Sequence, residues 1–380
     1  MSAIEGIRSF DPPRRVLMGP GPSDVDPRVL AAMARPTIGH LDPEFVRMMD
    51  ELKELLRYAF QTENRVTFPV SGPGSVGMET CFVNLVEPGD RVLVCINGVF
   101  GGRQLENVKR CGGVPVVVED DWGTPVSLDK LEAALAAEPD VRLVSFVHAE
   151  TSTGVRSDAE AIAAIAHAHG ALVIADTVTS LGGIPVLVDE WRLDAVYSGT
   201  QKCLSCTPGL SPVTFGGAAL EKVKARTTTC QSWFMDLNLV LPYWEGGART
   251  YHHTAPINPL YGLHEALIML AEEGLDAAWR RHAENHAALV DGLAKIGVEM
   301  FVEPAYRLPE LNLVCVPEGI DDAWVRSEAL KRYGLEFGNG LGVLAGKVWR
   351  IGLMGTSSTP QNVQLCLEVL ETLLGESAQA

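Results

Sequence analysis

The sequence predicts an α/β fold: a large domain with a mainly parallel seven-stranded sheet, followed by a smaller C-terminal α+β domain. Short apolar, β-branched segments alternate with helical patterns between residues 65 and 215, which is typical of a parallel sheet covered by helices. The length of 380 residues exceeds the roughly 250–300 residues at which a single core stops growing. We therefore expect an N-terminal arm over residues 1–18, a large domain over 19–272 and a small domain over 273–380.

Seven short segments supply the expected strands of the large domain: 65–70, 91–96, 114–119, 141–148, 171–176, 195–198 and 211–215. Helical periodicity stands between them, notably over 43–60, 128–137 and 158–169. From about residue 260, two long helical stretches run through residue 293. Short strands near 298, 311–316, 335 and 348–351, and a last helix after Pro360, then predict the α+β domain.

The charge and cysteine content argue against several classes of protein. A net charge of −17 makes nucleic acid an unexpected partner, because phosphate backbones are bound through clustered Lys and Arg. Eight irregularly spaced cysteines favour a reducing compartment, and the pair Cys203 and Cys206 lacks the further ligands of a zinc site, so we expect no metal. With neither a signal-like start nor an apolar run near the ~18 residues of a membrane span, we expect a cytoplasmic protein.

A glycine-rich loop follows the first strand of the large domain. Gly72 begins a G-x-G-x-x-G pattern, which raises the alternative of an NAD-dependent oxidoreductase. Pro73 removes an amide from the turn, and Asp90 begins the next strand where a ribose-binding acid would end it. A single phosphate fits better, bound by helix N-terminal amides from Gly74 onward and by the Ser75 hydroxyl. A turn that merely packs is the plainer alternative.

Asp176 closes one predicted strand and Lys202 follows another, at the sheet edge where open α/β sheets bind ligands. Alone, Asp176 could be a helix cap and Lys202 a solvated surface group. Together, an acid closing a buried strand and a lysine in a Ser-Gly-Thr-Gln-Lys turn match the layout of fold-type-I pyridoxal-phosphate enzymes.

Blocks spread over nearly the whole chain resemble those of class V aminotransferases of the alanine–glyoxylate and serine–glyoxylate group. They are MGPGPSDVDPRVLAAM, SGPGSVGMET, HAETSTG, DTVTSLGG, SGTQK, TYHHTAP and GKVWRIGLMG, in the family's order. The resemblance implies the pyridoxal-phosphate transferase fold, pyridoxal 5′-phosphate as cofactor and a homodimer with shared active sites. It also implies ping-pong transamination between a small amino acid, alanine or serine, and a 2-oxoacid, glyoxylate.

The resemblance assigns cofactor-binding roles within one chain. Lys202 would bind the cofactor as a Schiff base and later move the Cα proton, which requires a neutral amine. Asp176 would pair with the ring nitrogen. Phe100 would stack on the ring where the family often has Trp, with an ordinary core Phe as the alternative. Further residues assigned to the cofactor are Thr151 near the ring hydroxyl, Gln201, Ser75 and the Gly74 amide at the phosphate, and Val178.

Other residues are assigned to the neighbouring subunit or to the substrate. Tyr251 and Thr254 would reach the phosphate of the neighbouring subunit. Arg350 would bind the substrate carboxylate through its planar fork, with a structural salt bridge as the alternative. Gly21 and His40 would bound the substrate pocket.

Three alternatives to transamination follow from related or simpler proteins, and the first of them, desulfuration, is disfavoured. A cysteine desulfurase would carry a nucleophilic cysteine on a small-domain loop, and residues 316–365 contain none. In the ureidoglycine–glyoxylate branch, Asn and Gln stand where this sequence has Tyr251 and His40, so these two favour alanine or serine. A non-catalytic protein would bind the cofactor without transferring the amino group.

Overall fold

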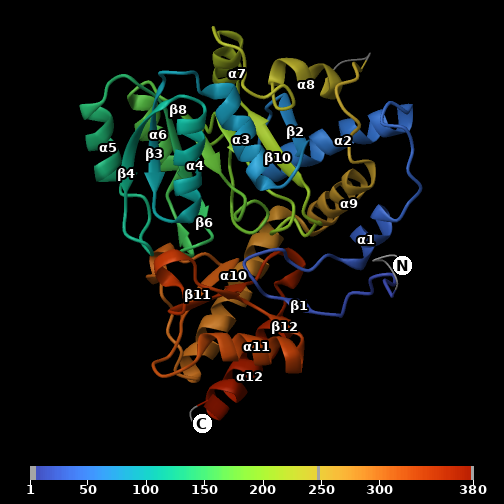
Figure 1. Ribbon diagram of the computed structural model, residues 1–380, viewed down its shortest axis with the longest axis vertical. Helices are drawn as coiled ribbons and strands as arrows, with labels where there is room; N and C mark the ends of the chain where they lie inside the picture. Colours follow the sequence, from blue (N-terminus) through green and yellow to red (C-terminus); the bar gives the residue numbers. More distant parts are fainter. Residues whose placement is uncertain (1–5, 246–248, 378–380) are drawn as a thin grey trace.

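The computed structural model describes residues 6–245 and 249–377. Residues 1–5 of the expected arm and 378–380 of the expected small domain lie outside the described residues. A sheet covered by helices forms the upper part of the molecule in Figure 1, and the C-terminal segment forms the lower part.

Seven strands form the central sheet, in the order β2-β10-β9-β8-β5-β3-β4. They are β2 (Val66–Ser71), β3 (Arg91–Ile96), β4 (Val114–Glu119), β5 (Val141–Val147), β8 (Leu172–Asp176), β9 (Ala195–Tyr197) and β10 (Leu210–Phe215). Each lies within one residue of its expected segment at either end, so the seven-stranded sheet is confirmed. β10 runs antiparallel to both its neighbours and the other pairs are parallel.

Helices cover both faces of this sheet (Figure 1). They include α2 (Pro43–Phe60), α3 (Gly74–Leu85), α4 (Val99–Arg110), α5 (Leu128–Ala137) and α6 (Ala159–Ala168). α3 and α4 contact each other on one face, and α5 and α6 contact each other on the opposite face. This follows from right-handed crossovers, because the chain moves along the sheet in one direction through α4 and in the other through α5 and α6.

Capping side chains set the starts of three predicted helices. Asp42 accepts a hydrogen bond from the Glu44 amide before α2, and Ser127 accepts one from the Lys130 amide before α5. Asp158 does the same before α6. α2 and α5 have the predicted bounds, and α6 is one residue shorter at each end.

The remaining elements of the upper part are short or lie around its edge. They are α1 (Pro27–Met33), β6 (Ala149–Glu150), β7 (Val155–Arg156), α7 (Gly217–Lys224), α8 (Leu237–Trp244) and α9 (Ile257–Glu273). The lower part contains α10 (Leu275–Lys295), η1 (Pro304–Tyr306), β11 (Leu311–Cys315), α11 (Asp322–Tyr333), β12 (Leu335–Glu336), β13 (Gly338–Asn339), η2 (Gly342–Leu344), β14 (Val348–Gly352), η3 (Gly355–Ser357) and α12 (Pro360–Ser377). Its three-stranded antiparallel sheet has the order β11-β14-β13.

α10 connects two hydrophobic cores. Leu275 and Ala278 near its start belong to the core around the large sheet, whereas Leu289 and Leu293 belong to the C-terminal core. β1 (Val16–Leu17) of the arm pairs in parallel with β12, so the arm joins the lower part. The strand expected near residue 298 does not form. This segment makes only one isolated β-bridge, between Met300 and Val314. The domain boundaries themselves stay a prediction.

No helix among the described residues is both long enough and apolar enough to cross a membrane.

Candidate active site

A cavity of about 200 Å³ lies at the carboxyl end of the parallel strands. Its lining residues follow β2, β3, β5, β8 and β9 along the chain, which is where open α/β sheets place ligands. The structure brings together here every cofactor residue that the sequence assigned within one chain: Gly74, Ser75, Phe100, Thr151, Asp176, Val178, Gln201 and Lys202.

Lys202 is a buried amine, with 8% of the residue exposed. Its Nζ donates a hydrogen bond to the carbonyl of Pro20, in the segment that follows β1. Burial, assisted by the positive charge of Arg350, lowers the pKa of Lys202 to about 8. Gly21 leaves room for this side chain, because a Cβ there would lie 2.7 Å from Lys202 Cδ. Gly21 therefore lies next to Lys202, and its predicted place at the substrate pocket stays a prediction.

Asp176 ends β8 and faces the same cavity. Its Oδ1 accepts a hydrogen bond of 2.8 Å from the Val178 amide. Burial raises the pKa of Asp176 to about 7, and the nearby Glu150 acts in the same direction, against the hydrogen bonds and the charge of Lys202. Asp176 is therefore an acid whose charge is poorly compensated within the chain.

The start of α3 supplies a set of donors for an anion. Gly74 and Ser75 are its first two residues, and both line the cavity. A Cβ at Gly74 would lie 3.1 Å from Val178 Cγ2, so glycine keeps this approach open. Gln201 Oε1 is buried without a hydrogen-bond partner among the described residues. Since this loop shares its cavity with Lys202, the single-phosphate interpretation is favoured over the dinucleotide one.

Phe100 lines the cavity from the first turn of α4, and its backbone is held by an acid that the sequence analysis missed. The buried Glu150 accepts hydrogen bonds from the amides of Phe100, at 3.1 Å, and Gly101, at 3.4 Å. Ser152 caps the same helix by accepting a bond of 2.9 Å from the Val99 amide, and its hydroxyl donates to Glu150 at 2.6 Å. A charged residue beside an apolar strand was the sequence feature that could have identified Glu150.

Arg350 lies on β14 beside the cavity, with 7% of the residue exposed. Its Nε donates to the Asn339 carbonyl at 2.8 Å, and Nη1 lies 3.5 Å from the Thr151 carbonyl oxygen. Burial lowers its pKa to about 10, opposed by Glu150. Arg350 forms no ion pair with any described residue. No described acid therefore supports the alternative that Arg350 belongs to a structural salt bridge.

Five predicted residues do not line this cavity within one chain: Arg350 and Gly21, which contact residues that do line it, and Tyr251, Thr254 and His40. Tyr251 is 60% exposed, and its ring centroid lies 5.3 Å from that of His40. Thr254 is also exposed. The His40 carbonyl accepts a hydrogen bond of 3.3 Å from the Tyr243 hydroxyl, which fixes this group at the edge of the large domain.

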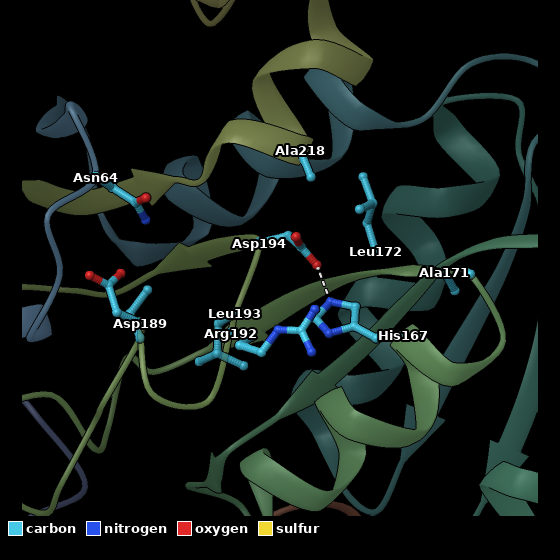
Figure 2. Close-up of a pocket in the computed structure, with 11 residues that line it drawn as sticks. Asn64, His167, Ala171, Leu172, Asp189, Arg192, Leu193, Asp194 and Ala218 are labelled. Atoms are coloured by element: carbon cyan, nitrogen blue, oxygen red, sulfur yellow. Dashed lines mark hydrogen bonds and ion pairs between the residues drawn. The ribbon is translucent and has the colours of Figure 1, made fainter.

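A separate depression of about 440 Å³ lies at the opposite edge of the sheet, near the start of β8 (Figure 2). His167 Nε2 bonds to Asp194 Oδ2 at 2.8 Å, and the same oxygen accepts from the Val173 amide at 2.8 Å. The pair thus fastens α6 and the residue before β9 to the sheet. None of the predicted site residues lies in this depression, and we assign it a structural role.

The cysteine pair after Lys202 is buried and free. Cys203 Sγ donates a hydrogen bond of 3.3 Å to the Thr179 carbonyl. Within residues 6–245 and 249–377, no group of three or more His, Cys, Asp or Glu side chains is arranged to hold a metal ion.

Comparison with known proteins gives the same family as the sequence blocks. Residues 17–347 match the model of the family described as aminotransferase class-V. The chain is 40% identical to an alanine–glyoxylate aminotransferase of Oryctolagus cuniculus, over 97% of this chain and 94% of that protein. It is 37% identical to an (S)-ureidoglycine–glyoxylate transaminase of Bacillus subtilis, over 98% of this chain and 93% of that protein.

The fold agrees equally closely with solved structures. The crystal structure of an alanine–glyoxylate aminotransferase from Nostoc sp. superposes with a TM-score of 0.95 at 45% identity, covering 97% of each chain. The fold expected from the resemblance is therefore confirmed. By its family match and by relatives that align over almost its full length, the chain belongs to the class V aminotransferase family.

Proposed function

We propose that the protein binds pyridoxal 5′-phosphate and transfers an amino group from alanine or serine to a small 2-oxoacid, glyoxylate, in two half-reactions. The observation that carries this proposal is the position of Lys202 and Asp176 in one buried cavity at the carboxyl end of the parallel strands. When bound, pyridoxal phosphate supplies a carbonyl carbon that accepts an amine and a ring that withdraws electrons from the substrate Cα.

Lys202 supplies the amine that holds the cofactor and, once displaced by substrate, the base that moves the Cα proton. Both roles need an unprotonated Nζ. With its pKa lowered to about 8, roughly a tenth of the lysine is neutral at pH 7, far more than for an ordinary lysine. The nearby Arg350 contributes to this, because it disfavours a second positive charge.

Asp176 holds a proton at the ring nitrogen by pairing with it. Burial without a cation raises the pKa of Asp176, and a cation beside its carboxylate would lower that pKa again. A positively charged group beside Asp176 would therefore stabilise its carboxylate, which supports the pairing of Asp176 with the protonated ring nitrogen.

The remaining lining residues fit the other parts of the cofactor. The amides of Gly74 and Ser75 at the start of α3, with Gln201, would bind the phosphate. Phe100 and Val178 would pack on the ring, and Thr151 would contact its hydroxyl region.

We also propose a homodimer with shared active sites. The exposed side chains of Tyr251 and Thr254 would reach the cofactor phosphate bound by the neighbouring subunit. His40, beside Tyr251, would border the substrate pocket of that subunit. The eight free cysteines support a reducing compartment, and we propose the cytoplasm.

Arg350 is the proposed site for the substrate carboxylate, with Gly21 bounding the space beside Lys202. A buried guanidinium that forms no ion pair with any described residue is suited to a carboxylate that arrives with the substrate. Glyoxylate as acceptor is supported by the names of both the alanine–glyoxylate and the ureidoglycine–glyoxylate relatives. Ureidoglycine is the second candidate donor, favoured by the 37% identical relative.

The test begins with the cofactor. Purified protein incubated with pyridoxal phosphate should show a visible absorption band that disappears in Lys202→Ala and persists in Lys347→Ala, which removes an exposed lysine. Addition of L-alanine or L-serine should remove the band, and glyoxylate should restore it. A screen of alanine, serine and ureidoglycine with glyoxylate or pyruvate then ranks the donors. A band that survives in Lys202→Ala, or no band at all, would refute the proposal.

A further inference from the structure

A second cavity, of about 620 Å³, lies between the large-sheet part and η1 of the C-terminal part. Its apolar wall includes Leu128, Ile184 and Trp191, and Tyr306 of η1 contributes an aromatic ring from the other side of the junction. Its lining shares no residue with the cavity around Lys202. The volume lies within the ~300–1,000 Å³ that small-molecule sites occupy.

The polar lining of this cavity carries charges of both signs. Arg156, on β7, is exposed and forms no ion pair with any described acid. Glu160, in the first turn of α6, is exposed and pairs with no described cation. Asp158 lies beside it and caps α6 by accepting a hydrogen bond of 3.0 Å from the Ala161 amide. The cavity thus offers a cation at one position and an acidic group at another, each without an ion-pair partner among the described residues.

His148 adds a buried hydrogen-bonding group. It is 2% exposed, and its Nδ1 pairs with the Ser180 hydroxyl at 3.0 Å. Its ring meets that of Trp191 edge to face, with centroids 5.4 Å apart. No described residue pairs with Nε2, and the ring lines the cavity. Burial, reinforced by the charge of Arg156, lowers the pKa of His148 to about 3, so it offers a neutral ring nitrogen.

We propose that this cavity is a second binding site for a free α-amino acid with a large apolar or aromatic side chain. Arg156 pairs with the carboxylate, and the acidic rim of Asp158 and Glu160 receives the ammonium group. The side chain packs against Ile184 and Trp191. A phosphorylated ligand fits less well, because its charge would lie next to the two acids.

An occupant of this cavity would touch both parts of the molecule. Tyr306 belongs to η1. The backbone of the adjacent Arg307 forms an isolated antiparallel β-bridge with Val155 at the start of β7. The C-terminal part also carries Arg350 on β14. The site is therefore placed to hold the two parts in a fixed relation without contacting Lys202.

The test uses the holoenzyme and labelled L-phenylalanine in equilibrium dialysis at millimolar concentrations. The visible absorption band reports occupancy of the cavity around Lys202, so binding beyond that occupancy measures the second site. Wild type should bind about one extra equivalent per chain, and Arg156→Gln should weaken this binding by about tenfold or more. Arg142→Gln, which removes an exposed arginine near the start of β5, should leave the binding of the extra equivalent unchanged.

Two probes separate the charges. 3-Phenylpropionate lacks the ammonium group and phenethylamine lacks the carboxylate, and each should bind more weakly than L-phenylalanine. No extra equivalent, or binding that Arg156→Gln leaves unchanged, would overturn the proposal. Equal binding of phenethylamine would do the same, because it would show that the carboxylate is not recognised. The proposed function does not depend on the result, because the two cavities share no residue.

Discussion

Replacing Glu310 by glutamine should change how the stability of the protein depends on pH. Glu310 is fully buried, and neither of its carboxyl oxygens has a hydrogen-bond partner among the described residues. It lies against the large domain, because a Cβ added at Gly183 would be 3.2 Å from Glu310 Cβ. Burial raises the pKa of Glu310 from 4.5 to about 8, and the positive charge of Arg156 opposes this only in part.

The sign of the effect follows from the two pKa values. Between pH 4.5 and about 8 the folded chain keeps the proton on Glu310 and the unfolded chain loses it. The free energy of unfolding therefore falls as pH rises through this interval, by up to about 1.4 kcal/mol per pH unit. Over the whole interval the loss is on the order of 5 kcal/mol, and Glu310→Gln removes it.

The assay is urea unfolding of wild type, Glu310→Gln and Glu318→Gln between about pH 5 and about pH 8. Glu318 is exposed and serves as the matched control. The difference in unfolding free energy between Glu310→Gln and wild type should shift in favour of the variant as pH rises. The test is how this difference changes with pH. Its value at any one pH is not informative, because a buried glutamine has its own hydrogen-bonding cost. Parallel pH curves for wild type and Glu310→Gln would refute a protonated Glu310.

Four further variants test the active site. Asp176→Asn should lower kcat by about 100-fold or more, because the ring nitrogen loses its anionic partner; steady-state kinetics with cofactor saturation checks this. Arg350→Gln should raise KM for both amino acid and oxoacid by about 10- to 100-fold with a smaller change in kcat, and equal loss in both constants would contradict carboxylate binding. Glu150→Gln should lower the pKa of the Lys202 amine in the cofactor-free protein, since Glu150 raises that pKa; the pH dependence of the rate of cofactor addition checks this, and an unchanged midpoint would mean that Glu150 is already protonated. Tyr251→Phe should weaken cofactor binding, and mixed dimers with Lys202→Ala should regain part of the activity if sites are shared.

The edge strand β4, which is largely exposed, was predictable from its β-branched residues, and the other six strands of the large sheet were predictable because they are largely buried on both faces. Such strands appear as continuous apolar runs bounded by Gly, Pro or charged residues, and their ends agreed to within one residue. The direction of β10 was not predictable, because an apolar run carries no information about its orientation. The pairing of β1 with β12 was also missed, since two-residue strands more than 300 residues apart leave no pattern in the sequence.

The residues of the site were predictable where they follow strands in recognisable blocks. Phe100, Thr151 and Gln201 gain their positions from the strands that precede them, so sequence order carries the geometry. The family block predicted that the segment around Gly21 lies at the substrate pocket, but the hydrogen bond between Lys202 and Pro20, which are 182 residues apart, could not be inferred. The role of Tyr251 in the neighbouring subunit and that of His40 at the substrate pocket stay predictions, because both residues lie outside the cavity of their own chain.

The hydrogen-bond partner of Lys202 helps to explain why this lysine can act as a neutral amine. An ion pair with Asp176 would stabilise the ammonium form and raise the pKa of the lysine. Instead its Nζ bonds to the Pro20 carbonyl, a neutral acceptor, while Gly21 leaves the side chain unobstructed. Burial and the charge of Arg350 then outweigh the attraction of Asp176, and the pKa falls to about 8. Asp176 is left without a cation, so the same arrangement that frees the amine also preserves a carboxylate for the ring nitrogen.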